Sequence, residues 1–338
     1  MAALGEADVT AFHRVTVVIP VFRGEATLSP LIDEIAPLTM PNRSPDGNVF
    51  RVSEVLLVDD HGPDRSDVVI RELATRHDVV RSIWLSRNFG QHAATLAGMA
   101  SSSGDWIVTM DEDGQHDPAD IGRLLDAAVS TRSQVVYAAP VNRPPHERWR
   151  NLSSRAVKWV FARLVSGGDA VAFQSYRMIL GEVGRSVAAY AGTGVFLDVA
   201  LGWVSGSTTS CPVTLRAAPG RRSGYSFGRL VQHFWRMVLS SGNRPLRLVS
   251  ALGTLFALGG IGFAIYLVVA HIASGATPQG WTSTMVVILV ATGAILFSLG
   301  VIAEYLGVAV SMAMGRPPYL IVGDPEDGPL GPRDPRAT

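Results

Sequence analysis

The first 137 residues alternate short apolar runs with segments that have the periodicity of a helix. The runs have the length of buried strands and cover residues 15–19, 54–58, 79–85, 106–110 and 135–137. Between them, apolar residues recur three and four positions apart, as at Leu28, Leu31, Ile32 and Ile35. Repeated strand–helix units with continuously apolar strands are typical of a mostly parallel sheet covered by helices on both faces. We therefore expect an α/β domain over residues 15–226, after a tail of residues 1–14.

The last third of the chain has a different apolar pattern. Residues 248–270 and 285–303 contain no charged residue, and each run is long enough to cross a bilayer as a helix. A long apolar core helix is the alternative interpretation. Arginines precede the first run and follow the second, whereas residues 272–284 contain no Lys or Arg. By the positive-inside rule we expect a two-helix transmembrane region over 248–314 in the cytoplasmic membrane, with the α/β domain and both termini in the cytoplasm.

Two further segments flank this region. Residues 227–247 carry apolar side chains three and four positions apart, with arginines off that stripe. This pattern also fits an ordinary core helix, but its place before a membrane segment favours an interfacial amphipathic helix. Residues 315–338 form the C-terminal tail, which is rich in Pro, Gly and Asp from residue 323, and we expect it to be largely disordered.

Charge and cysteine content exclude several classes of function. The formal net charge is zero, so we expect no nucleic-acid partner. Cys211 is the single cysteine, which excludes an intramolecular disulfide and a zinc site built from several cysteines. Neither the glycine-rich dinucleotide fingerprint nor the P-loop motif occurs, which counts against a dinucleotide-dependent oxidoreductase and a P-loop NTPase.

Polar side chains that could bind a ligand or take part in catalysis follow three consecutive strands. Asp59-Asp60 comes after the second strand, Arg87-Asn88 after the third, and the acidic loop of residues 111–115 after the fourth. The carboxyl ends of parallel strands lie at one edge of a sheet, so we expect these loops to converge. Close carboxylates repel each other, and a divalent cation with oxygen ligands would offset that repulsion. An isolated acidic loop of this kind is more often a solvated turn; the two neighbouring loops favour a site.

Four segments in this order resemble the family 2 glycosyltransferases of GT-A fold. They are VVIPVF at 17–22, VDD at 58–60, LSRNFG at 85–90 and MDEDGQH at 110–116. Within that family the chain is most similar to the dolichyl- and undecaprenyl-phosphate sugar synthases, in order and spacing over about residues 15 to 320.

The resemblance implies a donor site and a metal site. The residues implied for nucleotide-sugar binding are Pro20, Phe22, Glu25, Val58, Asp60, Arg87, Asp111 and Glu112. The residues implied as ligands of Mg²⁺ or Mn²⁺ are Asp111, Asp113 and Gln115. The chain departs from the family pattern at Gly24, where a glutamate is common, at Ser175, where an acid is common, and at Phe227, where a lysine is common.

Basic residues follow the predicted sheet. Those implied to bind the acceptor phosphate are Arg143, Arg155, Arg177 and Arg221, although a charged run can also be a solvated face. The residues implied in catalysis are Asp111, Asp113, Arg177, Arg221 and Arg222.

The resemblance therefore implies a membrane-anchored, inverting glycosyltransferase that moves a sugar from a UDP- or GDP-linked donor to a polyprenyl phosphate such as undecaprenyl phosphate. Two alternatives stay open: transfer to another membrane lipid or a lipid-linked glycan, and an inactive membrane scaffold. The sugar and the nucleotide are not readable from the sequence. A homo-oligomer is compatible with it.

Overall fold

The computed structural model describes residues 12–142, 174–192, 195–216 and 280–328, together with short stretches between 249 and 272. The chain divides into two compact units. The first comprises residues 1–156, 168–224 and 317–338, and the second comprises residues 157–167 and 225–316.

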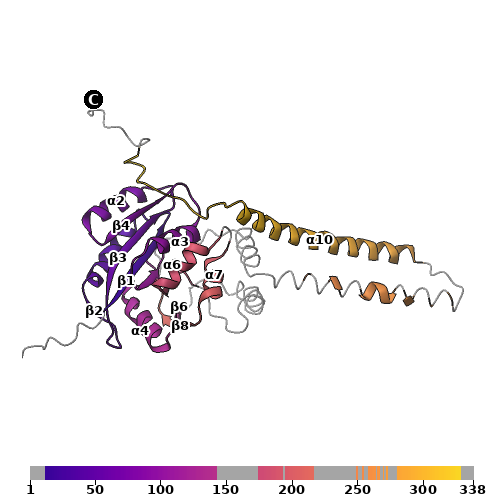
Figure 1. The fold of residues 1–338 in the computed structure, drawn as a ribbon, viewed down its shortest axis with the longest axis horizontal. Coiled ribbons are helices and arrows are strands. Elements are labelled where there is room, and N and C mark those ends of the chain that lie inside the picture. Colours follow the sequence, from indigo (N-terminus) through magenta and orange to yellow (C-terminus); the bar gives the residue numbers. More distant parts are fainter. Residues whose placement is uncertain are drawn as a thin grey trace, which may run out of the picture. The chain divides into compact units, whose positions relative to one another are not determined.

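A mixed sheet forms the centre of the first unit (Figure 1). Its strand order is β8-β6-β7-β5-β1-β3-β4-β9, and β2 pairs with β3. The pairs β1–β3, β1–β5, β3–β4 and β6–β8 are parallel. The strands are β1 (His13–Val21), β2 (Asn42–Arg43), β3 (Val49–Asp59), β4 (Val80–Leu85), β5 (Trp106–Thr109), β6 (Val135–Pro140), β7 (Arg177–Leu180), β8 (Thr208–Val213) and β9 (Ile321–Val322).

The five predicted strands are confirmed as β1, β3, β4, β5 and β6. The sequence pattern did not predict β7, which lies antiparallel between β5 and β6. It is four residues long and almost wholly buried, so it lacks the alternation that marks a half-exposed strand. Most paired residues of the sheet are in parallel pairs, and antiparallel pairing occurs at β2, β7 and β9.

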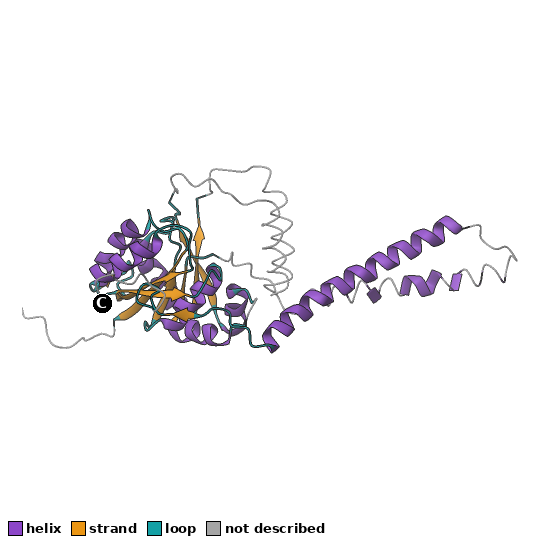
Figure 2. Cartoon of the chain, turned by 90° about the horizontal axis from the view of Figure 1, so that it is seen from above, coloured by secondary structure: helices purple, strands orange, loops and turns teal. Residues whose placement is uncertain are grey.

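Helices cover both faces of the sheet, as Figure 2 shows. Val17 and Ile19 of β1 belong to one hydrophobic core and Val18 to the other, because successive side chains of a strand point to opposite faces. Residues of α1, α2 and α4 fill the first core, and residues of α3, α6 and α7 fill the second. The helices are α1 (Leu28–Ile35), η1 (Ala36–Thr39), α2 (Ser66–Arg76), α3 (Gln91–Ser101), η2 (Pro118–Asp120), α4 (Ile121–Thr131), α6 (Gly181–Tyr190) and α7 (Leu197–Val204).

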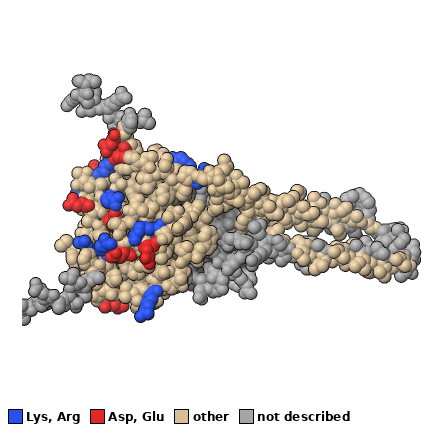
Figure 3. All heavy atoms as spheres, viewed as in Figure 1, with Lys and Arg blue, Asp and Glu red and all other residues tan. Residues whose placement is uncertain are grey.

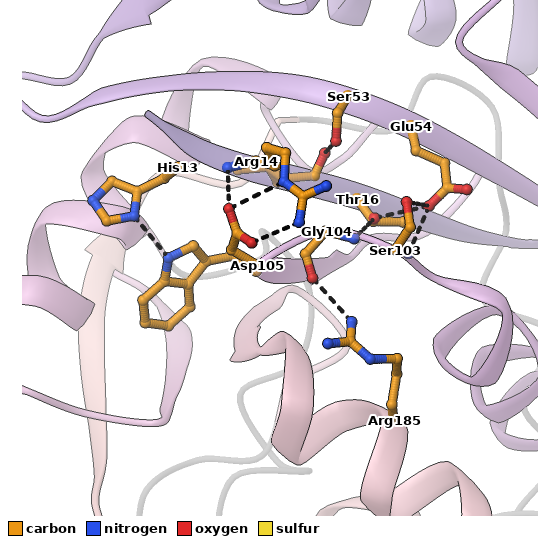
Figure 4. Close-up of polar contacts among 11 residues, drawn as sticks. His13, Arg14, Thr16, Ser53, Glu54, Ser103, Gly104, Asp105 and Arg185 are labelled. Atoms are coloured by element: carbon orange, nitrogen blue, oxygen red, sulfur yellow. Dashed lines mark hydrogen bonds and ion pairs between the residues drawn. The ribbon is translucent and has the colours of Figure 1, made fainter. Parts of the chain in front are cut away.

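Polar contacts join the amino-terminal ends of β1 and β5 (Figure 4). The Arg14 guanidinium donates to Asp105 at 2.9 Å, and the Arg14 backbone N–H donates to the same carboxylate at 2.9 Å. Buried Glu54 accepts from the Thr16 hydroxyl at 2.9 Å and from the Ser103 N–H at 3.0 Å. This end of the sheet is therefore fixed by side chains that lie opposite the loops of the predicted site.

In the second unit, α10 (Trp281–Ala313) contains the apolar stretch Val290–Val310, whose mean hydropathy is 1.9. Among the described residues it is the one helix long and apolar enough to span a membrane, and its visible side carries neither blue nor red atoms in Figure 3. α10 contains the whole of the predicted second span, 285–303. Of the first predicted span, 248–270, the structure describes scattered positions, each of them helical. The predicted interfacial helix, 227–247, lies outside the described residues, so the two-helix region stays a prediction.

Part of the predicted disordered tail is ordered. Residues 317–328 are described, and within them β9 pairs antiparallel with β4. The Pro, Gly and Asp content suggested disorder, but ion pairs from Asp324 and Glu326 to Arg71 of α2 anchor this segment. Residues 329–338 lie outside the described part of the chain.

Candidate active site

The acidic loop begins where β5 ends and turns sharply before η2. Met110 is buried at the end of the strand, and residues 112–114 form a turn. Gly114 takes φ = 72°, a backbone conformation that favours glycine. Asp117 then caps η2 by accepting the Ala119 N–H at 2.9 Å. The loop is thus held at both of its ends.

Asp111 is oriented by neighbours from two other segments. The Gln91 side-chain amide donates to Asp111 Oδ1 at 2.6 Å, and the Ser175 hydroxyl donates to Oδ2 at 2.7 Å. Gln91 is the first residue of α3, and Ser175 precedes β7. Because both donors are neutral, they fix the carboxylate without cancelling its charge.

His116 supports the backbone at Asp111. Its Nδ1 accepts the Asp111 N–H at 3.0 Å, and its ring stacks on Tyr176 with centroids 4.8 Å apart. Burial lowers the pKa of His116, and nearby Asp111 and Asp113 oppose that shift. A neutral imidazole with an unprotonated Nδ1 agrees with this hydrogen bond.

Asp113 and Gln115 lie in direct contact. The Gln115 backbone N–H donates to Asp113 Oδ1 at 3.1 Å, and its side-chain amide donates to Oδ2 at 2.7 Å. With Asp111 they present only oxygen ligands, the type that Mg²⁺ and Mn²⁺ prefer. In the described part of the chain, no three His, Cys, Asp or Glu side chains are grouped to hold a metal by themselves. The oxygen atoms of Asp111, Asp113 and Gln115 therefore fit a hard divalent cation.

Glu112 joins the acidic loop to the loop after β1. Its buried carboxylate accepts the Phe22 N–H at 2.6 Å and the Arg23 N–H at 3.0 Å. The resemblance implied donor binding by Glu112. In the structure these backbone contacts fix the position of Phe22, and donor binding by Glu112 stays a prediction.

Asp60 joins the loops after β3 and β4. It is buried and accepts the N–H groups of Phe89 at 2.7 Å and of Gly90 at 2.9 Å. Burial raises the pKa of Asp60, and these two hydrogen bonds oppose the shift. The Arg87 guanidinium lies 4.1 Å from the Phe89 ring centroid, on the exposed side of the same loop. The predicted convergence of the three loops is confirmed by these contacts and by the contact of Gln91 with Asp111.

The other residues implied for the donor lie around the ends of β1 and β3. Pro20 and Val58 are paired in register and buried, so their side chains belong to the interior of the sheet. Phe22 is 37% exposed. Glu25 is exposed and accepts the Arg65 N–H at 3.2 Å. Of this set, Phe22 and Glu25 present side-chain surface at the site.

Arg177 lies in the interior. It is 3% exposed, forms an ion pair with buried Asp198 and donates to the Thr109 hydroxyl at 3.1 Å. The sequence implied contact with the acceptor phosphate, but Asp198 already pairs with this guanidinium. The other arginines implied for catalysis or for the acceptor, Arg143, Arg155, Arg221 and Arg222, lie outside the described residues.

Three neighbours of Asp111 were not among the predicted site residues: Gln91, His116 and Ser175. His116 ends the MDEDGQH segment and was visible in the sequence as part of a matched motif, whereas Gln91 only adjoins the LSRNFG segment. For Ser175 the sequence indicated the loss of an acid. It gave no sign that the hydroxyl contacts Asp111.

Comparison with known proteins shows the family to which the chain belongs. Residues 16–184 match glycosyl transferase family 2, and residues 244–309 match the GtrB C-terminal hairpin. The undecaprenyl-phosphate 4-deoxy-4-formamido-L-arabinose transferase of Pseudomonas paraeruginosa is 32% identical over 314 residues, covering 91% of this chain and 89% of the relative. The transferase of the same name from Salmonella choleraesuis is 29% identical and covers 93% of this chain and 94% of its own.

Similarity to solved structures is more distant. Glucosyl-3-phosphoglycerate synthase from Mycobacterium tuberculosis, in complex with Mn²⁺ and UDP-glucose, is 18% identical, with a TM-score of 0.45. The match covers 69% of this chain and 79% of that one. A similarity of this size says nothing about the substrate. The match over residues 16–184, together with relatives that cover nine-tenths of the chain, shows that this protein is a glycosyltransferase and belongs to glycosyl transferase family 2.

Proposed function

We propose that this protein is a membrane-anchored, inverting glycosyltransferase that moves a sugar from a UDP- or GDP-linked donor to the phosphate of a polyprenyl carrier such as undecaprenyl phosphate. The observation that carries the proposal is the extent of the similarity to undecaprenyl-phosphate transferases. It spans 91% of the chain and therefore includes both the acidic loop and the apolar C-terminal third.

The donor binds across the loops after β1, β3, β4 and β5. Exposed Phe22 and the stacked Arg87–Phe89 pair offer flat surfaces to a base, and Asp60 holds the backbone beside them. Pro20 and Val58, buried at the ends of β1 and β3, lie beneath these flat surfaces and support them. Glu25 lies at the rim, and Glu112 fixes Phe22 beside the donor. These assignments follow the family motifs residue by residue.

The oxygens of Asp111, Asp113 and Gln115 suit a hard divalent cation, Mg²⁺ or Mn²⁺. When bound there, such a cation would neutralise charge on the leaving diphosphate and make its departure easier. The hydrogen bonds from Gln91 and Ser175 orient Asp111 for this task.

The reaction needs no general base. A phosphate oxygen of the lipid attacks the anomeric carbon, the bond from that carbon to the nucleoside diphosphate breaks, and the electron pair leaves with the diphosphate. Attack from the opposite side inverts the configuration. The lipid phosphate is already anionic near neutral pH, so no proton has to be removed. Ser175 in place of an acid is compatible with this chemistry.

The part of the site that binds the acceptor phosphate involves residues outside the described part of the chain. We assign contact with the lipid phosphate to Arg143, Arg155 and Arg221, with Arg222 beside the reacting groups. Arg177 acts through Asp198 and Thr109, because its guanidinium is buried with them. The N–H donors of a planar arginine guanidinium are spaced to bond two phosphate oxygens at once.

The membrane region brings the enzyme to its acceptor. The apolar stretch of α10 is one span, and residues 248–270 supply the other, preceded by the interfacial helix of 227–247. In this arrangement the protein is a multi-pass protein of the cytoplasmic membrane, with the catalytic domain and both termini in the cytoplasm. The proposal is compatible with a monomer or a homo-oligomer.

A panel of donors tests the proposal. Membranes that contain the protein are incubated with undecaprenyl phosphate, Mn²⁺ or Mg²⁺ and one radiolabelled UDP- or GDP-sugar at a time. We expect one donor to give a lipid-extractable product that mild acid hydrolyses. An acid-stable glycolipid would assign the enzyme to another acceptor. If the protein bound no nucleoside diphosphate with Mn²⁺, it would be an inactive scaffold.

A further inference from the structure

The segment that follows α10 in sequence returns to the edge of the sheet. β9 pairs antiparallel with β4, with Ile321 opposite Leu85 and Val322 opposite Trp84. The Ser86 N–H donates to the Leu320 carbonyl at 3.0 Å and extends this pairing by one residue. A strand of two residues has too few hydrogen bonds to hold its place alone, so other contacts must anchor it.

Arg71 of α2 supplies that anchor, although 253 residues separate it from Asp324. Its Nε and Nη2 each donate to the Asp324 carboxylate at 2.8 Å. Its Nη1 lies 2.9 Å from Asp67 and 3.0 Å from Glu326. The guanidinium also lies 4.7 Å from the centroid of a Trp84 ring.

The geometry of this contact makes it stronger than a typical surface ion pair. The Arg71 and Asp324 side chains are only 20% and 17% exposed. Two parallel N–H···O bonds fix the carboxylate in one orientation, and partial burial reduces screening by water and salt. The hydrogen bonds from Arg71 also lower the pKa of Asp324, so its carboxylate stays charged over a wide pH range.

The anchored segment directly contacts the loop of residues 86–90, called the donor loop below. Ser86, whose N–H is held by Leu320, is the first residue of the loop that leads to Phe89 and Gly90. These two residues donate to Asp60, and the next residue, Gln91, donates to Asp111. The start of the donor loop is therefore fixed by the C-terminal segment, and its end is fixed by two site carboxylates.

We infer that residues 319–326 and Arg71 form a C-terminal clasp that positions the loop of residues 86–90 for binding of the nucleotide-sugar donor, a consequence that rests on the proposed function. Arg71 and Asp324 are its positioning residues. Without the clasp, β4 becomes an edge strand and residues 85 and 86 lose their partners on that side. The loop then loses order before the donor binds, and binding has to restore that order.

A purely structural role is the alternative, in which the clasp covers a sheet edge and affects stability alone. The chain offers a matched control in Arg14, which pairs with Asp105 at 2.9 Å at the amino-terminal end of β1 and β5 (Figure 4). That pair also joins distant parts of the chain but touches none of the site loops. Its loss measures the general effect of removing an arginine ion pair.

The experiment uses the full-length protein and four variants: Arg71→Gln, Asp324→Asn, the double variant and Arg14→Gln. Hydrogen exchange of the amides of residues 86–91 reports loop order without any ligand. We expect exchange there to rise at least about tenfold in both single variants, with no further rise in the double variant and no change in Arg14→Gln. Unchanged exchange in Asp324→Asn, or an equal rise in Arg14→Gln, overturns the clasp.

Donor affinity is then measured by titration with UDP and with GDP, each with Mn²⁺. For the nucleotide that binds, we expect the Kd to rise about five- to tenfold in the clasp variants, and kcat at saturating donor to stay within about twofold. An equal Kd in all variants overturns the positioning role. If the unmodified protein binds neither nucleotide, the proposed function fails, while amide exchange still decides whether the clasp orders the loop.

Discussion

The Glu112 carboxylate accepts the Phe22 backbone N–H at 2.6 Å, across 90 residues of sequence. This contact connects the acidic loop to the loop after β1. Charge-assisted hydrogen bonds contribute about 1.5–3 kcal/mol. We therefore expect Glu112→Ala to reduce kcat/KM at least about tenfold, mainly through a higher KM for the donor.

Glu112→Gln is the matched control, because it keeps an oxygen acceptor and the side-chain length. Its effect should be clearly smaller than that of alanine. Equal kcat/KM for the alanine variant and the unmodified enzyme would show that the position of Phe22 does not depend on Glu112.

Asp60 accepts two backbone N–H groups, and an amide side chain has one oxygen to offer them. In Asp60→Asn the NH₂ group faces one of these N–H groups, leaving a buried donor unpaired at a cost of about 1–3 kcal/mol. We expect the Kd for the nucleoside diphosphate to rise at least about fivefold, as measured by titration with Mn²⁺. Asp59→Asn, one residue away, is the control, and an equal effect of both variants would contradict the role given to Asp60.

Asp59 should make stability depend on pH. Burial raises its pKa to about 6, against an unfolded value near 4. Because the folded state holds this proton more tightly, the stabilisation is fully present below about pH 4 and is lost as the pH rises through about 6. Thermal unfolding of the detergent-solubilised protein between pH 4 and 7 should show this decline, and Asp59→Asn should flatten it. Parallel curves for the two proteins would contradict the shift.

Arg177 and Asp198 form a buried ion pair, so removing one partner leaves an unpaired charge in the interior. Such a loss typically costs about 3–5 kcal/mol. We expect Arg177→Gln to lower the unfolding temperature substantially, and Arg177→Met with Asp198→Leu to recover much of it. A stable Arg177→Gln protein that fails only to use the lipid acceptor would instead support direct contact with phosphate.

Much of the fold follows from local patterns. Leu28, Leu31, Ile32 and Ile35 were expected on one helical face, and all four are buried in α1. The strand runs were found because a buried parallel strand is apolar along its whole length. β7 and β9 are short and depend on partners far away in the sequence, so no local period marks them.

The sequence predicted which loops form the site, but not which groups each side chain contacts. The topology brings Asp60, Asp111 and their neighbours to one edge, as the order of strands suggested. Motif resemblance could not distinguish a ligand-facing side chain from one that holds the backbone. Glu112 lies in the MDEDGQH segment and Arg177 is among the residues implied for the acceptor, yet their partners in the structure are Phe22 and Asp198, which are distant in sequence.

The metal site gives a direct test within the acidic loop. Asp113→Ala removes a carboxylate implied as a ligand, and we expect it to abolish metal-dependent turnover while leaving the unfolding temperature nearly unchanged. Chelation with EDTA should abolish turnover of the unmodified enzyme, and Mn²⁺ or Mg²⁺ should restore it. Near-normal activity of Asp113→Ala would overturn the metal assignment.

The central claim is that the nucleophile is a lipid phosphate. The most direct measurement supplies the same labelled donor with undecaprenyl phosphate, with the unphosphorylated alcohol undecaprenol and with diacylglycerol, in parallel reactions. We predict labelled lipid from undecaprenyl phosphate alone, labile to mild acid and absent with Asp113→Ala. Labelled product from the alcohol or from diacylglycerol at a comparable rate would contradict the account.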